Sequence, residues 1–107
     1  MAKYLAKVNY TPPHGIQGLL KDGGTGRVKA ATQLIEALGG KVESFYFAFG
    51  DVDAFVILDM PDSVAGAAAS LTVSAGGGAT VQVVELLTPE EIDAAAKKSP
   101  AYSPPGQ

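Results

Sequence analysis

The stretch that decides the fold is FYFAFGDVDAFVIL, residues 45–58, in which two apolar arms meet at one glycine and two acids. Aromatic and β-branched residues favour strands, and a polar tip between two such runs predicts a hairpin. We expect its arms over residues 41–49 and 54–60, with Pro61 ending the second arm. Carboxylates cluster beside aromatic rings at the tip, so the tip is also the first candidate site.

Outward from the hairpin, period-2 alternation predicts two further strands, over residues 4–10 and 79–87. Between the first strand and the hairpin, apolar residues recur at helical spacing over residues 28–38. The glycine-rich segment 22–26 before that helix is expected to be a flexible loop, with a short turn or helical piece over residues 16–21. A strand and a helix are therefore predicted to precede the hairpin in the chain.

Two more helices are expected after the hairpin. Asp62 is suited to cap a small-residue helix that ends at the glycines 76–78. The run Thr88-Pro89-Glu90-Glu91 is a capping box with proline at the first helical position, which predicts a third helix over residues 90–98. The proline-rich segment 99–107 is expected to be a tail that extends along a surface or a neighbour, outside a single domain of residues 1–98.

The order βαββαβ with a final helix is that of the ferredoxin-like α+β fold, in which two helices cover one face of a four-stranded antiparallel sheet. The other face is left open. Both alternation sets of the hairpin arms carry large apolar groups, for example Phe45 and Phe47 against Tyr46. An uncovered apolar face predicts a second subunit laid against it, and hence a homo-oligomer.

Composition narrows the class of partner. The chain has 107 residues, 47% of them hydrophobic, and a net charge of −3 with its eight Lys and Arg residues scattered, which argues against nucleic acid. Cysteine is absent, which excludes disulfides, thiolate metal sites and a thiol nucleophile. No apolar run reaches the roughly 18 to 20 residues of a membrane span, and the first residues lack the apolar core of a secretory signal. We therefore expect a soluble cytoplasmic protein.

The chain resembles the GYD-domain family over nearly its whole length up to about Lys98. The resemblance is carried by the opening strand with a tyrosine, Leu38-Gly39-Gly40-Lys41, the run Phe45-Tyr46 to Asp53, the strand ending at Pro61-Asp62, and Leu87-Thr88-Pro89-Glu90-Glu91. It implies a ferredoxin-like subunit of the dimeric α/β-barrel kind, in bacterial proteins whose function is largely unassigned. The family's Gly-Tyr-Asp signature is altered to Gly50-Asp51-Val52-Asp53, which puts in doubt any role for a tyrosine hydroxyl there.

Asp51 and Asp53 flank a single residue, so in an extended tip their carboxylates point the same way and could share a cation or a proton. The alternative is turn chemistry, in which Asp51 caps the bend and Asp53 begins the second arm. A metal ion would need more oxygen ligands than these two, and the sequence does not identify them. Turn formation is the favoured interpretation.

His14, the one histidine, follows two prolines at the end of the first strand. It could act as a general base or a haem ligand near the mouth of the sheet, although a loop histidine without such a role is more common. Tyr10 and Tyr46 could line a cavity with it, or be core residues with satisfied hydroxyls. Gly23-Gly24-Thr25-Gly26-Arg27 opens a helix but lacks the remainder of a phosphate-loop or dinucleotide pattern, which leaves anion binding through Arg27 a minor alternative.

Two functions are compatible with these residues. In the first, the protein binds a small ligand in an apolar cavity beside the sheet, with His14, Tyr10, Tyr46, Asp51 and Asp53 as candidate contacts. In the second, it is a structural or regulatory assembly subunit whose aromatic residues are used up in the interface. The sequence contains no complete cofactor or metal pattern, and it identifies no reaction.

Overall fold

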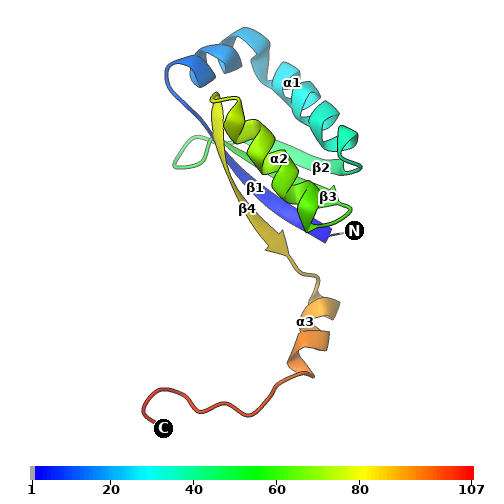
Figure 1. Ribbon diagram of the computed structural model, residues 1–107. Coiled ribbons are helices and arrows are strands. Elements are labelled where there is room, and N and C mark those ends of the chain that lie inside the picture. Colours follow the sequence, from blue (N-terminus) through cyan, green and yellow to red (C-terminus); the bar gives the residue numbers. More distant parts are fainter. Residues whose placement is uncertain (1) are drawn as a thin grey trace.

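The computed structural model describes residues 2–107, which form four strands and three helices (Figure 1). In chain order they are β1 (Ala2–Tyr10), α1 (His14–Ala37), β2 (Lys41–Phe47), β3 (Ala54–Met60), α2 (Ser63–Ala75), β4 (Ala79–Leu86) and α3 (Pro89–Ala96). None of these helices is long and apolar enough to cross a membrane.

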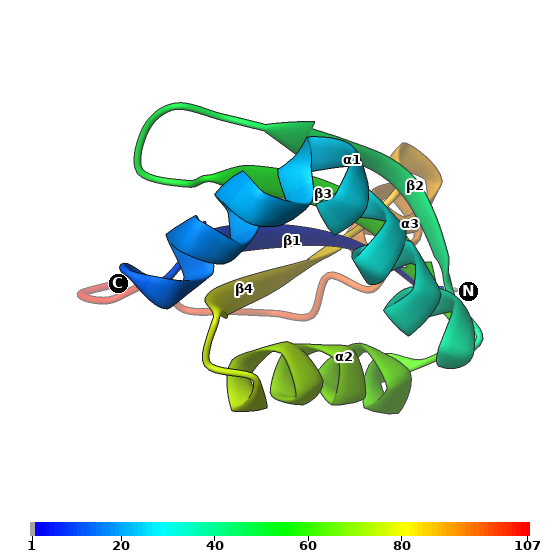
Figure 2. The ribbon, with the colours of Figure 1, turned by 90° about the horizontal axis from the view of Figure 1, so that it is seen from above.

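The strands form one sheet in the order β2-β3-β1-β4, and every neighbouring pair is antiparallel. Helices α1 and α2 lie over the same face of this sheet (Figure 2). The fold is therefore α+β and ferredoxin-like, as the order of predicted elements indicated.

The hairpin is formed by β2 and β3, and β3 has the bounds predicted for it. The other arm stops at Phe47 rather than at Phe49, because the chain turns after Ala48, whose N–H donates to the carbonyl of Asp53 (2.8 Å). A register shift between Val42 and Ser44 marks a bulge in β2.

The prediction of a glycine-rich loop before the first helix is wrong. The chain is helical from His14 to Ala37, with one non-helical residue inside, Gly23 (φ 74°, ψ 168°). Only glycine adopts this conformation without strain, so the helix bends at Gly23 and continues. The glycines at 24 and 26 lie in the helical part after the bend.

The helix caps read from the sequence are confirmed. The Asp62 carboxylate accepts from the Ala65 N–H (2.8 Å), and Thr88 and Glu91 form a reciprocal capping box. Strand β4 ends at Leu86, one residue earlier than predicted, and α3 covers Pro89–Ala96 rather than residues 90–98. Shifts of this size are usual at element ends.

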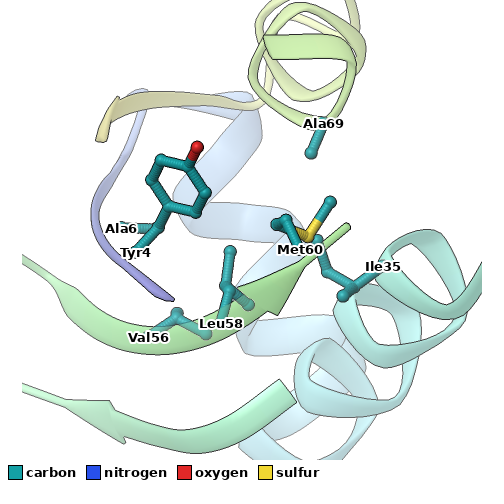
Figure 3. Close-up of a cluster of buried hydrophobic side chains, with 7 residues drawn as sticks. All are labelled: Tyr4, Ala6, Ile35, Val56, Leu58, Met60 and Ala69. Atoms are coloured by element: carbon teal, nitrogen blue, oxygen red, sulfur yellow. The ribbon is translucent and has the colours of Figure 1, made fainter. Parts of the chain in front are cut away.

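The core lies between the sheet and the two covering helices. Seven buried residues form it, of which Met60 is completely buried and sits between Ile35 of α1 and Ala69 of α2 (Figure 3). The other members are Tyr4, Ala6, Val56 and Leu58. Because side chains alternate along a strand, these residues share the helix-covered face of β1 and β3.

The opposite face of the sheet carries the other alternation set, and α1 and α2 leave it uncovered (Figure 2). Cross-strand pairs place six apolar side chains on it: Leu5, Tyr46, Phe55, Ile57, Val84 and Leu86. We call these six residues the open-face patch. At its edge Lys3 contacts Glu43 and lies 3.3 Å from Asp59, and the hydrogen bond to Glu43 raises the pKa of Lys3.

Beyond β4 the chain leaves the body of the molecule (Figure 1). Residues 87–107, here called the arm, contain α3 and the proline-rich tail, and every one of them is exposed. The exposed arm residues include the apolar side chains of Leu87, Ile92 and Tyr102.

Candidate functional site

An apolar cleft of about 130 Å³ lies between α1, α2 and the covered face of the sheet. Its floor is built from strand residues such as Tyr4, Phe45 and Val81, and its walls from residues on the two helices. The strands supply large side chains here because this alternation set faces the core. The cleft is thus continuous with the hydrophobic core.

Small residues on the helices keep the cleft open. Ala30 and Ala31 line it from α1, and Gly66 and Ala69 line it from α2. A Cβ atom at Gly66 would lie 3.6 Å from the Tyr4 ring, which is ordinary van der Waals contact. Larger side chains at such positions would therefore occupy the space that is now part of the cleft.

Arg27 is the charged residue of the cleft lining. It stands in the helical part of α1 after the bend, and Ala30, Ala31 and Leu34 follow it at three, four and seven residues, so all four share one face of the helix. One guanidinium nitrogen, Nη1, lies 3.3 Å from an Asp22 carboxylate oxygen. The buried Nε has no hydrogen-bond partner among residues 2–107.

A second and more polar pocket, of about 330 Å³, adjoins the cleft. It lies between the first turns of α1 and the end of α2, and His14 and Thr72 contribute polar groups to it. Four residues line both spaces: Tyr10, Arg27, Val73 and Ala79. The cleft and the pocket therefore meet at Arg27 and Tyr10.

Of the five residues selected from the sequence, two line the cleft or the second pocket. Tyr10, which is buried, and His14, which is exposed, both line the second pocket. Tyr46 is 72% exposed and belongs to the open-face patch, on the other side of the sheet. Asp51 is exposed at the hairpin tip. Tyr46, Asp51 and Asp53 are absent from the lining of both spaces.

Asp53 joins the hairpin tip to the end of β1. Its carboxylate accepts from the Tyr10 backbone N–H (2.9 Å), and its own N–H donates to the carbonyl of Val8 (3.0 Å) and to Oδ1 of Asn9 (3.1 Å). These bonds use Asp53 in a structural connection between β1 and the turn. Within residues 2–107 no group of three or more His, Cys, Asp and Glu side chains is arranged to hold a metal ion.

Sequence reasoning gave Arg27 only a minor part, because residues 23–27 lack the remainder of a phosphate-loop or dinucleotide pattern. The informative signal was its spacing from Ala30, Ala31 and Leu34, which places one arginine on the apolar face of a helix. That spacing becomes visible once the predicted helix is extended back by one residue, to Arg27.

Comparison with known proteins finds a domain family and solved structures to which the chain is similar. The model of the GYD domain matches residues 4–96. A crystal structure of a protein of unknown function from Nitrosomonas europaea is similar with a TM-score of 0.42 and 20% sequence identity, over 81% of this chain and 90% of that chain. No curated protein sequence matches the chain.

Proposed function

The chain belongs to the GYD-domain family, and we propose that it binds a small, largely apolar molecule in the cleft between its two helices and its sheet. The observation that carries this proposal is an apolar cleft of about 130 Å³ kept open by alanines and glycine. Binding sites for small molecules are typically concave and mostly apolar, with a few polar groups that fix orientation. Tyr10 and Arg27 supply such groups at one end.

The size of the cleft limits what it can hold. An engineered apolar cavity of roughly 150 Å³ binds benzene, so a cleft of this volume suits a single ring or a short branched chain. Burial of such a group contributes about 25 cal/mol for each Å² of apolar surface removed from water. The expected ligands are therefore molecules with one ring-sized apolar part.

Filling the cleft tests this proposal. Toluene serves as the probe, and its binding is followed by changes in backbone amide NMR signals of the cleft residues. We expect Ala30→Phe to abolish these changes, because the new ring occupies the cleft, while Ala37→Phe at the exposed end of the same helix leaves them intact. Binding that survives Ala30→Phe in a folded variant, or signal changes confined to the open-face patch, would refute the proposal.

A specific observation also supports assembly. We propose that two copies pair through the open-face patch, with the arm of each copy lying on the other. The patch consists of apolar side chains on the uncovered face of the sheet. The arm also carries exposed apolar residues, and it makes few contacts with the body of its own chain (Figure 1). A two-fold pair would give both features a partner at the same time, because symmetry repeats each contact.

Val84→Glu is the test of pairing. Val84 is 43% exposed on the patch, and a glutamate there has Lys3 and Lys7 diagonally across on β1, so a single copy should tolerate it. Buried in an interface, the same charge would be costly. Light scattering should show a dimer for the unchanged chain and for Val64→Glu on the outer face of α2, and a monomer for Val84→Glu. A monomeric unchanged chain would contradict pairing.

A further inference from the structure

We propose that the ligand of the cleft is an organic acid whose apolar part fills the cleft and whose carboxylate pairs with Arg27. This inference rests on the proposed function and names its ligand class. Three observations support it. Arg27 lies where the two spaces meet, its buried Nε has no hydrogen-bond partner within residues 2–107, and neither space has a lysine in its lining.

Arg27 stands where an apolar molecule in the cleft would present its polar end. The residue lines both the apolar cleft and the adjoining polar pocket, together with Tyr10. The polar substituent of a ring bound in the cleft would therefore face the second pocket as well as solvent. His14 and Thr72 line that pocket and can hydrogen-bond a carboxylate or the water around it.

The guanidinium of Arg27 has unused donors on the side that suits a carboxylate. Nη1 is the nitrogen nearest to Asp22 (3.3 Å), which leaves Nε and Nη2, the two donors of the side-on fork. Nε is buried and has no partner within residues 2–107. The Arg27 side chain is 35% exposed and lines the second pocket, so a ligand in that pocket has access to it.

Charge favours a monoanion over the other ligand types. Arginine is always charged, and its fork matches a carboxylate in two parallel hydrogen bonds. Asp22 already offsets part of the arginine charge, and neither space has a lysine in its lining, so a doubly charged phosphate would be poorly compensated. A cation would be repelled by Arg27, and a neutral carbonyl would accept from Nε without the added strength of a charge-assisted bond.

Matched ligands and variants test the inference. The probes are phenylacetate and its neutral analogue phenylacetamide, which share one ring and differ in charge. Isothermal titration calorimetry should give the acid an affinity about tenfold higher, as expected for a charge-assisted pair with partial exposure. Arg27→Gln should remove that preference, because it lowers the affinity for the acid more than the affinity for the amide. Lys29→Gln, which removes a charge from an exposed position of the same helix, should change neither affinity.

Each result separates this inference from the proposal on which it rests. If both probes bind with equal affinity, and toluene binding is lost in Ala30→Phe, the cleft is a binding site but the acid class is wrong. If the acid is preferred and Arg27→Gln leaves the preference intact, Arg27 is not its partner and the inference fails. If toluene, the acid and the amide all fail to bind, both the proposed function and this inference are refuted. Arg27→Lys keeps the charge and loses the fork, so a partial loss of preference would support two-point pairing.

Discussion

At the scale of single residues, Asp53 has a structural task that can be measured. Its carboxylate is the acceptor for the Tyr10 N–H, and Asp53→Ala removes that acceptor at a partly buried position. We expect Asp53→Ala to lower the free energy of unfolding by about 1–3 kcal/mol, the usual cost of a lost bond to a charged group. Asp53→Asn keeps a carbonyl acceptor and should lose less. Urea denaturation of the three proteins provides the comparison.

Ligand binding gives the control for Asp53. Asp53 lines neither the cleft nor the second pocket, so folded Asp53→Asn should bind toluene and phenylacetate as the unchanged chain does. A variant with normal stability and lost binding would instead assign the hairpin tip to the site, and the structural account of Asp53 would be wrong.

The residues of the site were harder to predict than those of the fold. Pairs such as Asp51 and Asp53 attract attention because they are close in sequence, yet the cleft is formed by residues distant in sequence, among them Tyr10, Arg27 and Val73. Tyr46 shows the same limit: alternation places it on one of two faces, and the pairing Tyr46 with Phe55 decides that it is the open one. Strand pairing and helix placement decide which residues become neighbours, and both are features of the tertiary structure.

At the scale of elements, strands and caps were predictable for local reasons. The β3 pattern alternates without interruption and Pro61 ends it, so its bounds follow from the chain alone. The capping box at Thr88 likewise depends on four consecutive residues. In the first half of α1 the sequence predicted only a short turn or helical piece over residues 16–21 and then a loop, because glycines favour loops. In the fold that half packs against the chain around Gly78, where a Cβ on Gly15 would lie 2.0 Å from the Gly78 carbonyl oxygen.

The bend in α1 gives a prediction at this scale. Gly23 has a backbone conformation that is essentially restricted to glycine, although a Cβ there would meet no atom within 4 Å. We expect Gly23→Ala to lower the free energy of unfolding by about 1–3 kcal/mol through backbone strain, or to straighten the helix and displace Arg27. Backbone strain should lower the melting temperature, and displacement of Arg27 should reduce the preference for phenylacetate over phenylacetamide.

Gly18 provides the matched control on the same helix. It has ordinary helical geometry and open space at its Cβ, so Gly18→Ala should stabilise the protein by up to about 1 kcal/mol, the difference in helix propensity. Thermal unfolding of the two variants should therefore shift in opposite directions. A rise in melting temperature for both would show that the bend at Gly23 is not required by the fold.

At the scale of the whole molecule, the body and the arm differ in whether they have buried residues of their own. The body has its own core between sheet and helices, whereas the arm has no buried residue among residues 87–107. The largest dimension of the molecule, 55 Å against 33 and 22 Å for the others, reflects an arm that stands off the body (Figure 1). The arm exposes Ile92 and Tyr102 and the sheet exposes an apolar patch, so both parts present apolar surface to solvent.

A chain ending at Thr88 tests how these parts are related. It retains all four strands, α1 and α2, and loses only exposed residues, so we expect its melting temperature at low concentration to match that of the intact chain. Because pairing stabilises by mass action, the intact chain should melt at higher temperature as its concentration rises, and the shortened chain should show a smaller rise. Sedimentation equilibrium should give the shortened chain the weaker dimer. If the shortened chain is unfolded at every concentration, the arm is required for the body itself to fold. If the shortened chain forms a dimer as strong as that of the intact chain, the sheet face pairs without the arm.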